Sequence, residues 1–456
     1  MKEFRQEDKI IDGVKKVHMI GIGGSGMNPL ASILHSKGYT LSGSDNNESD
    51  NLRRIRELGI KVFMGHNAEN LGDCELVVYS AAISSDNPEL KAAKERGIPT
   101  MERSHLLGAL TRKFDNVIGV SGTHGKTTVS SMLTQVLFMA GLDPSAVIGG
   151  KLPLINANGR AGQSEIMVCE ACEFVDTFLQ MSPDISILLN IDNDHLDYFG
   201  SMDNLCLSFK KFVDMSRVSF FNGDDALALK IKDDFKGEAF TFGLNENNYC
   251  RATDIKAGRN GMEFTAIAGD TEIPISLNIP GEHNIYNALA TIAVSHYLGV
   301  DPLDIKRGVE SFGGAGRRFE RLGEYGGITV ADDYAHHPTE IEATLKAAKQ
   351  LQFKRVIVVF QPFTFSRTEA LKDEFVEALS LADVAVLTPI MGSREQNTTG
   401  ISSDYIVDRI ENSYSAADFA DTVDWLSKNA KQGDLVLTMG GGDIYKAAHM
   451  FIEKIK

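Results

Sequence analysis

The sequence predicts an α/β protein of three domains, each with a largely parallel sheet flanked by helices. Short apolar runs of strand length alternate along the whole chain with segments of helical periodicity, an order that produces parallel sheets. Two glycine-rich turns, at 21–26 and 122–128, directly follow such apolar runs, as in nucleotide-binding α/β domains. The chain has 456 residues, enough for two or three domains, which we expect at 1–112, 113–322 and 323–456.

The composition is that of an ordinary globular protein, with 43% hydrophobic and 24% charged residues. A net charge of −16 argues against nucleic-acid binding, because phosphate backbones require a basic protein surface. No apolar run reaches the roughly 18–20 residues that span a bilayer, and the polar segment 1–13 is unlike a signal peptide. We therefore expect a cytoplasmic protein without membrane insertion.

The five cysteines are an odd number spread over a long chain, which favours reduced thiols over a disulfide framework. Cys169 and Cys172 form a C-x-x-C pair. Because no second pair and no histidine stands at zinc-finger spacing, we expect plain buried cysteines here rather than a zinc or redox centre.

A first nucleotide-binding unit is predicted at the start of the chain. Residues 15–20 form an expected strand, followed by a G-x-G-x-x-G turn, a helix at 27–37 and a strand at 40–43. The next acid lies about 20 residues beyond the glycines, where a dinucleotide fold binds a ribose. Such a Rossmann-like unit binds any diphosphate, so it favours UDP as well as NAD. The candidate residues are Gly21, Gly23, Gly24, Ser25, Gly26 and Asp45.

A phosphate-binding turn lies between the expected strand 117–120 and a helix through 129–133. Its glycines let backbone N–H groups close on phosphate oxygens, Lys126 can reach the β- and γ-phosphates, and the Thr127 hydroxyl can bind Mg²⁺. Val120 stands where the standard motif has glycine, so the turn is a compact variant in a P-loop ATPase-like central domain. The candidate ATP-binding residues are Gly122, Thr123, His124, Gly125, Lys126, Thr127 and Thr128.

Two more polar groups follow apolar strands of this domain. Glu170 ends the strand 166–169, and His195 follows the strand 185–190. Because ligands of open α/β sheets lie at the carboxyl ends of strands, both can face the phosphate-binding turn. With Thr127 they are candidate Mg²⁺ ligands, although a solvated loop histidine is the plain alternative for His195.

The last third again alternates strands and helices, which predicts another Rossmann-like unit. Polar loops at 332–338, 361–367 and 440–443 follow three of its strands and are expected at one edge of the sheet. Asp332 and Asp333 either take part in chemistry or cap the helix near 338–350. Glycines at 313–316 suggest a hinge, and the two arginines after them suit phosphate capture.

Several of these segments resemble the Mur ligases, the ATP-dependent amino-acid ligases of peptidoglycan precursor synthesis. GTHGKTT at 122–128 is similar to their phosphate loop, and EACEFVDTFL and LNIDNDHLDYFG are similar to their metal-binding blocks. GEHNIYNALA at 281–290 is similar to their adenine-binding block. The block IGIGGSGM near the start is similar to the one that binds the sugar nucleotide. In the last third, the blocks DDYAHHPTEI and FQPFTFSRT are similar to those that bind the amino acid.

The resemblance implies a ligase that joins L-alanine to the carboxylate of UDP-N-acetylmuramate through an acyl phosphate, with ATP as co-substrate and Mg²⁺ as cofactor. It implies adenine contacts for His283 and Asn287, for which a helix cap with a packed alanine face is the plain alternative; both can hold. Contacts to the amino acid or the sugar carboxylate are implied for Tyr334, His336 and Arg367. The catalytic groups that it implies are Lys126, His336 and Arg318. Relatives usually have histidine in place of Phe363 and often aspartate in place of Cys172.

Three other functions stay open on the sequence. A recycling ligase that attaches a ready-made tripeptide to the same sugar nucleotide shares many of these blocks. An NAD-dependent oxidoreductase would use the first glycine motif, but it leaves the turn at 122–128 without a role. A non-catalytic ATP-binding regulator would bind nucleotide without releasing ADP.

Overall fold

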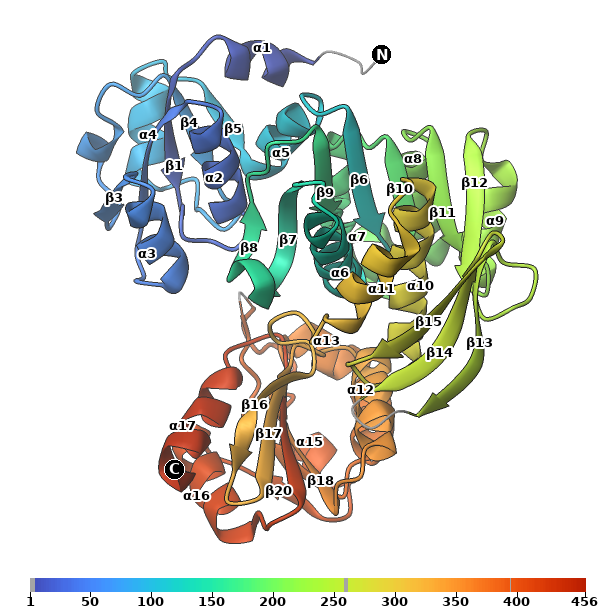
Figure 1. Ribbon diagram of the computed structural model, residues 1–456. Coiled ribbons are helices and arrows are strands. Elements are labelled where there is room, and N and C mark those ends of the chain that lie inside the picture. Colours follow the sequence, from blue (N-terminus) through green and yellow to red (C-terminus); the bar gives the residue numbers. More distant parts are fainter. Residues whose placement is uncertain (1–4, 258–260, 394) are drawn as a thin grey trace. The chain divides into compact units, whose positions relative to one another are not determined.

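The computed structural model describes residues 5–257, 261–393 and 395–456, and their strands form three sheets (Figure 1). The sheets are mostly parallel and flanked by helices, so the predicted α/β class is confirmed. By internal contacts the chain divides into two compact units. One is Met1–Thr253 with Thr265–Pro274 and Tyr286–Val309, and the other is Asp254–Phe264 with Ile275–Ile285 and Glu310–Lys456.

The first sheet is parallel, with the strand order β3-β2-β1-β4-β5. The central strand, β1, is buried at four of its five positions, which explains why it reads as a continuous apolar run. The elements of this region are α1 (Gln6–Asp12), β1 (Lys16–Ile20), α2 (Asn28–Ser36), β2 (Thr40–Asp45), α3 (Asp50–Glu57), β3 (Lys61–Met64), η1 (Ala68–Leu71), β4 (Leu76–Tyr79), α4 (Pro88–Glu95), β5 (Thr100–Glu102) and α5 (Arg103–Thr111).

The second sheet has the order β15-β14-β13-β12-β11-β10-β6-β9-β7-β8. β6 (Asn116–Ser121) pairs in parallel with β9 (Ile166–Glu170) on one side and with β10 (Ile185–Leu188) on the other. The chain builds the β9 side first and then crosses to β10, so the strand order reverses at β6. Ligands of open α/β sheets bind at the carboxyl ends of strands beside such a reversal, which places the phosphate-binding turn where a ligand is expected.

The second sheet also contains the strands β13, β14 and β15 at one edge. In β14 buried residues alternate with half-buried ones, and in β15 mostly with exposed ones, as in strands with one face on a core. The elements are α6 (Lys126–Met139), β7 (Ser145–Leu152), η2 (Pro153–Ile155), β8 (Ala157–Arg160), η3 (Phe174–Gln180), α7 (Leu196–Phe199), α8 (Met202–Val213), β11 (Val218–Asn222), α9 (Ala226–Asp234), β12 (Glu238–Gly243), β13 (Cys250–Ala257), β14 (Met262–Ala268), β15 (Thr271–Leu277), α10 (Glu282–Tyr297) and α11 (Pro302–Glu310).

The third sheet has the order β16-β17-β21-β18-β19-β20, parallel except for the β16–β17 pair. Two short helices, α13 and α14, follow β18 and are separated at Leu371. The elements are β16 (Glu320–Tyr325), β17 (Ile328–Asp333), α12 (Pro338–Gln350), β18 (Arg355–Phe360), α13 (Phe365–Ala370), α14 (Lys372–Leu379), β19 (Val384–Leu387), α15 (Asp404–Val407), β20 (Ser413–Ser415), α16 (Phe419–Asn429), β21 (Asp434–Met439) and α17 (Tyr445–Ile455).

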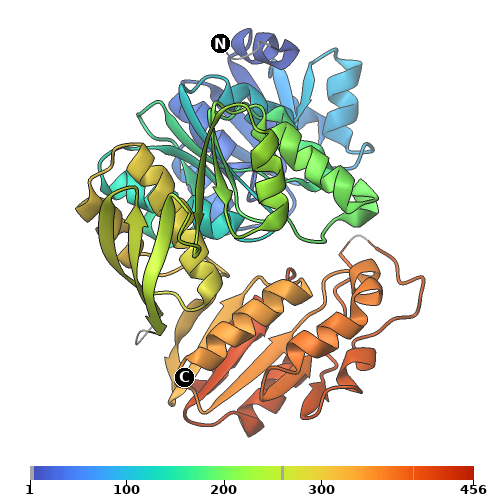
Figure 2. The same ribbon diagram turned by 90° about the vertical axis from the view of Figure 1, so that its right-hand side faces the viewer.

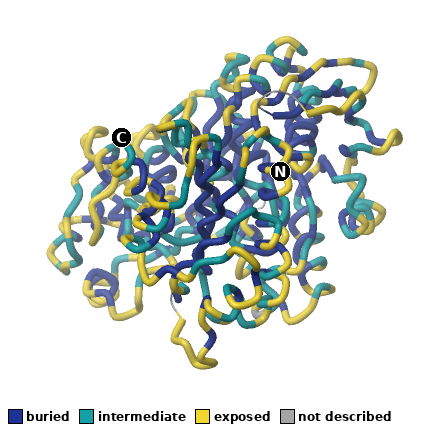
Figure 3. Tube along the Cα trace, turned by 90° about the horizontal axis from the view of Figure 1, so that it is seen from below, coloured by how far each residue is buried: buried dark blue, intermediate teal, exposed yellow. Residues whose placement is uncertain are grey.

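Two apolar cores cover the two faces of the third sheet. In β18, Val356, Val358 and Phe360 pack with α12 and α14, whereas Ile357 and Val359 pack with α16 and α17. This alternation follows from the two-residue period of a strand. Figure 2 shows orange helices over one face of this sheet. Figure 3 shows the trace coloured by burial, with buried segments inside and exposed segments mostly at its outer parts.

Within the described ranges, none of the helices joins enough length to enough apolarity to cross a lipid bilayer.

Candidate active site

The phosphate-binding turn lies between the end of β6 at Ser121 and the start of α6 at Lys126. Gly122 and Gly125 both have positive φ, 135° and 88°, which favours glycine. A Cβ at Gly125 would also lie 2.5 Å from Asn287 Oδ1, so Asn287 of α10 lies against the turn. Val120 belongs to β6, where it pairs with Ile187 of β10 and Glu170 of β9; a β-branched residue suits this strand position, and the compact turn starts only after it.

The side-chain ammonium of Lys126 contacts the backbone of this turn. Its Nζ donates to the carbonyl oxygens of Gly122 at 2.6 Å and Thr123 at 2.9 Å, and it lies 2.9 Å from a carboxylate oxygen of Glu173. Burial acts to lower the Lys126 pKa, but the charge of Glu173 acts against it and the net direction is upward. The turn therefore carries a charged lysine at its centre.

The predicted metal ligands Thr127 and Glu170 lie in contact. Thr127 Oγ1 donates to Glu170 Oε1 at 3.0 Å, and the other carboxylate oxygen accepts from the backbone N–H of Gly149 at 2.6 Å. A hydroxyl and a carboxylate beside a phosphate-binding turn are the oxygen ligands that Mg²⁺ prefers, so this pair fits the metal. Sequence reasoning missed Gly149, although glycine inside a strand often marks a close approach, and a Cβ there would lie 2.5 Å from Glu170.

His195, the third predicted metal ligand, is the N-cap residue of α7 and follows β10, on the other side of β6 from Glu170. It has a positive φ of 55°, its ring lies 4.9 Å from the ring of Phe174, and its Nε2 lies 3.6 Å from the Asp194 carboxylate. Its role beside Glu170 stays a prediction.

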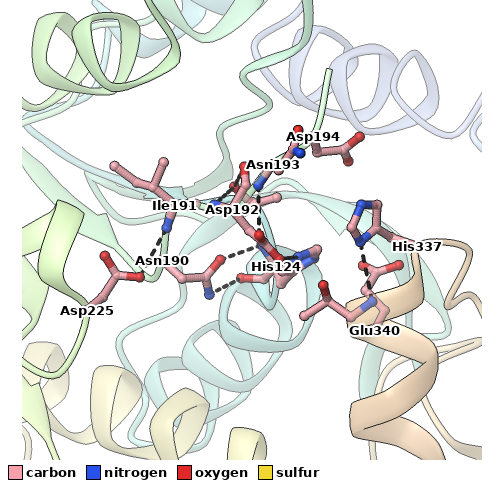
Figure 4. Close-up of polar contacts among 12 residues, drawn as sticks. His124, Asn190, Ile191, Asp192, Asn193, Asp194, Asp225, His337 and Glu340 are labelled. Atoms are coloured by element: carbon pink, nitrogen blue, oxygen red, sulfur yellow. Dashed lines mark hydrogen bonds and ion pairs between the residues drawn. The ribbon is translucent and has the colours of Figure 1, made fainter. Parts of the chain in front are cut away.

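His124 is fixed by two polar residues that follow β10 (Figure 4). Its backbone N–H donates to Asn190 Oδ1 at 2.8 Å, its carbonyl accepts from Asn190 Nδ2 at 3.0 Å, and its Nε2 lies 3.0 Å from Asp192 Oδ2. Asp192 also donates its backbone N–H to Thr123 Oγ1 at 2.9 Å. Sequence reasoning did not select Asn190 or Asp192, although a run of polar residues directly after a strand was a usable signal.

The two residues predicted for adenine differ in exposure. Asn287 is buried and lies against the turn at Gly125, whereas His283, one turn earlier in α10, is exposed. The contact with Gly125 thus brings Asn287 to the phosphate-binding turn.

The first glycine motif forms a tight turn after β1. Gly21 has a φ of 76° and donates its N–H to the carbonyl oxygen of Ser44 at 2.8 Å. The backbone N–H of Gly23 donates to Asp45 Oδ2 at 3.0 Å, so the predicted ribose-binding acid lies on the glycine turn. Arg103, which sequence reasoning did not select, packs at Gly26, where a Cβ would lie 3.1 Å from its Cδ. The turn thus gathers Gly23, Asp45 and a basic side chain.

The two arginines before β16 have different partners. Arg317 donates from Nε to Asp332 Oδ2 at 2.7 Å and from its other nitrogens to the carbonyl oxygens of Gly440 and Gly442, each at 2.8 Å. It thereby ties β17 to the loop after β21. Arg318 lies 3.9 Å from a Glu340 oxygen and, through its guanidinium carbon, 5.3 Å from the Tyr334 ring centroid. The side-chain contacts of Arg318 are thus longer than those of Arg317.

Asp332 and Asp333 do not cap α12, so the capping interpretation is wrong. The N-cap of α12 is His337, which accepts from the N–H of Thr339. Asp333 instead accepts from the N–H groups of Ala335 and Phe319, both at 2.7 Å, and so closes the loop onto the segment before β16. Burial raises the Asp333 pKa to about 6, against the opposing effect of Arg318.

We expect Asp333→Asn to change how the stability of this region depends on pH. The native pKa of about 6 exceeds the ordinary carboxyl value of 3.8, so stability from the protonated group is complete below about pH 4 and is lost as pH rises through 6. The shift amounts to roughly 3 kcal/mol. The free energy of unfolding of the wild type, taken relative to that of the variant, should fall by this order between pH 4 and 7. Denaturant titrations followed by Trp425, the single tryptophan, measure it; a constant difference would contradict the assignment.

His336 lies among the three predicted polar loops. Its Nδ1 is 3.1 Å from the carbonyl oxygen of Tyr334 and 3.3 Å from Glu340 Oε2, and its ring lies 6.0 Å from that of Phe363. A Cβ at Gly441 would lie 3.3 Å from both rings. The structure thus brings loops 332–338, 361–367 and 440–443 together, as predicted.

Two more predictions concern residues near these loops. Arg367 is half-buried in the first turn of α13, where its backbone N–H donates to Thr364 Oγ1 at 3.4 Å. The expectation of two buried thiols in the C-x-x-C pair is half wrong, because Cys169 is buried in β9 but Cys172 is exposed in the loop after it.

Comparisons with family models match the chain in three consecutive parts. Residues 16–115 match the Mur ligase family catalytic domain, residues 120–295 the Mur ligase middle domain, and residues 317–442 the Mur ligase glutamate ligase domain.

The chain is also similar over nearly its whole length to curated proteins. It is 45% identical over 452 residues to the UDP-N-acetylmuramate--L-alanine ligase of Acetivibrio thermocellus, covering 96% of each chain. It is 42% identical to the protein of the same name from Caldanaerobacter subterraneus, covering 98% of this chain and 99% of that one.

Solved structures agree. The crystal structure of the UDP-N-acetylmuramate-alanine ligase of Thermotoga maritima has a TM-score of 0.82 at 28% identity, covering 96% of this chain and 98% of that one. A murein peptide ligase from Psychrobacter arcticus has a TM-score of 0.73 at 23% identity, covering 97% and 98%, which shows a shared fold. Relatives above 40% identity along almost the entire sequence, and three matching domains in order, establish that this chain belongs to the Mur ligase family.

Proposed function

We propose that this protein joins L-alanine to the carboxylate of UDP-N-acetylmuramate at the expense of ATP, a cytoplasmic step of peptidoglycan precursor synthesis. The observation that carries the proposal is the similarity, at 41–45% identity and over at least 96% of the chain, to proteins that bear the name of this ligase. The residues around the phosphate-binding turn support it, because a charged lysine and oxygen ligands suit phosphoryl transfer.

We assign the three substrates to three parts of the chain, 1–112, 113–322 and 323–456. The first would bind the uridine diphosphate end at Gly21, Gly23, Gly24, Ser25, Gly26 and Asp45, and the second ATP at residues 122–128 with Asn287 and His283. The third would bind the amino acid at Tyr334, His336 and Arg367. The contact of Asp45 with Gly23 and that of Asn287 with the turn at Gly125 support the first two assignments.

The reaction follows from these groups. Backbone N–H groups of the turn and the Lys126 ammonium bind the phosphates. The carboxylate of the sugar nucleotide attacks the γ-phosphorus, which gives an acyl phosphate and ADP, and Arg318 is assigned contact with the transferred group. The amine of L-alanine then attacks the acyl carbon, its proton passes to His336 or to water, and phosphate leaves. Exclusion of water protects the acyl phosphate.

Thr127, Glu170 and His195 are the residues that would hold Mg²⁺. The contact between Thr127 and Glu170 supports the first two. A bound Mg²⁺ would neutralise phosphate charge. The second oxygen of Glu170 is fixed by the N–H of Gly149, which holds the first oxygen toward Thr127.

ADP release in the presence of UDP-N-acetylmuramate tests the proposal. We expect release with free L-alanine and little with the tripeptide L-alanyl-γ-D-glutamyl-meso-diaminopimelate, and loss of release after removal of divalent cations. The opposite preference would assign the recycling ligase. If neither acceptor gives ADP release, the protein is better described as a non-catalytic ATP-binding regulator. Hydride transfer from NADH would instead favour the NAD-dependent oxidoreductase.

A further inference from the structure

The buried carboxylate of Glu173 has no role in the mechanism above. Its side chain is only 3% exposed, and its oxygens lie 2.9 and 3.1 Å from the Nζ of Lys126, whose side chain is 14% exposed. With the carbonyl oxygens of Gly122 and Thr123 it surrounds one side of the ammonium. The ammonium that we assign to phosphate binding thus has an anionic protein partner.

The backbone that carries Glu173 is strained. Val175 and Asp176, the second and third residues after it, have positive φ of 54° and 55°. For a β-branched residue this is a true outlier, and the valine is exposed, so its packing gives no compensation. Strain of this kind persists where surrounding contacts fix the chain, and it clusters at functional sites.

Two sets of contacts hold this segment. The N–H of Asp176 donates to the carbonyl oxygen of Glu173 at 2.9 Å, which closes a tight turn. The Asp176 carboxylate accepts from the hydroxyl of Tyr198 at 3.1 Å and also from that of Ser208 in α8. The turn is therefore anchored to α7 and α8, and Glu173 is held toward Lys126 rather than toward solvent.

The charges around Lys126 set up a competition. A nucleotide brings several negative charges to the turn, and the ammonium that should bind them is in an ion pair with a buried carboxylate. Close charge pairs of this kind change affinities measurably. We propose that Glu173 is a positioning residue that serves as the counter-ion of Lys126 when no nucleotide is bound, and that it competes with the nucleotide phosphates for this ammonium. The inference depends on the proposed function, because it takes Lys126 as the phosphate-binding group.

The consequence is a weaker hold on nucleotide than the turn alone would give. ADP dissociates more easily because the Lys126 ammonium can pair with the Glu173 carboxylate. For the same reason inorganic phosphate binds to the turn less tightly. Glu173 thereby differs from Glu170, which contacts Thr127 and is assigned to the metal.

The test is the affinity for ADP in the absence of divalent cations, measured by titration calorimetry on the full chain. Glu173→Gln keeps the shape of the side chain and removes its charge. We expect ADP to bind roughly 5- to 20-fold more tightly than to the wild type. Glu165→Gln is the matched control, the same change at an exposed position before β9, and should leave the affinity unchanged. Glu173→Asp, which keeps the charge but shortens its reach, should give a smaller gain in the same direction.

The same substitution in a Lys126→Met background separates competition from simple repulsion. If Glu173 acts by occupying the lysine, its replacement should improve ADP binding less in the Lys126→Met protein than in the wild type. An equal or larger gain there, or unchanged or weaker binding in Glu173→Gln itself, would overturn the inference. If Lys126 does not bind phosphate, the wild type and Lys126→Met should bind ADP equally. Failure of the proposed function itself looks different, because the wild type would then release no ADP with UDP-N-acetylmuramate and L-alanine.

Discussion

Lys126→Ala is expected to lower the rate of ADP release by roughly 10²- to 10³-fold at saturating substrates. The substitution removes the positive charge that should stabilise the β- and γ-phosphates as the phosphoryl group transfers, and preorganised charges of this kind are worth about this factor. Steady-state ADP release with UDP-N-acetylmuramate and L-alanine measures the effect.

Loss of the lysine also leaves the Glu173 carboxylate buried without its cation. Breaking a buried ion pair from one side typically costs about 3–5 kcal/mol, so the single variant should unfold more easily than the wild type. The double variant Lys126→Ala/Glu173→Gln removes the orphaned charge and should regain much of the stability but none of the turnover. This comparison separates a catalytic effect from a folding defect.

Lys94→Ala is the control for the general effect of removing a lysine. Lys94 is exposed in α4, and its replacement should change neither ADP release nor stability. Full turnover in Lys126→Ala would show that the turn at 122–128 is not where the phosphoryl group is transferred.

The parts of the fold predicted from the sequence are those fixed by local chemistry. β1, β6, β9 and β18 are buried strands of a parallel sheet, so they read as continuous apolar runs. Glycines mark the turns after β1 and β6 because positive φ requires them there. Resemblance to the Mur ligases added residues such as Asn287, which no local pattern selects.

The parts that were missed depend on contacts between distant segments. Glu173 pairs with Lys126, 47 residues away, and Asn190 holds His124, 66 residues away, so no local spacing reveals either contact. A glycine is needed at position 149 because a Cβ there would collide with the carboxylate of Glu170, 21 residues further on. Asp332 and Asp333 precede a helix, which suggested caps, but their oxygens are taken by Arg317, Thr438 and two backbone N–H groups.

Gly125→Ala should damage both stability and turnover, and Gly141→Ala is its matched control. Both glycines have positive φ, 88° at Gly125 and 77° at Gly141. A Cβ at Gly141 would meet no atom within 4 Å, whereas one at Gly125 would lie 2.5 Å from Asn287 Oδ1 and 3.2 Å from Leu189 Cδ1. Both substitutions therefore place an alanine at a positive φ, but only Gly125→Ala also brings its Cβ too close to Asn287.

The left-handed conformation alone costs an L-residue about 1–2 kcal/mol, so Gly141→Ala should lower the free energy of unfolding by this amount and leave turnover intact. The collision at Gly125 adds about 1–3 kcal/mol, as other overpacked sites do. It also displaces the turn or Asn287, and a shift of about 1 Å in a catalytic site costs on the order of 10²-fold in rate. Calorimetric unfolding and ADP release measure the two effects. Gly125→Ala/Asn287→Ala should recover part of the stability, because the alanine at 287 lacks the colliding oxygen; equal behaviour of Gly125→Ala and Gly141→Ala would mean that Asn287 does not lie against the turn.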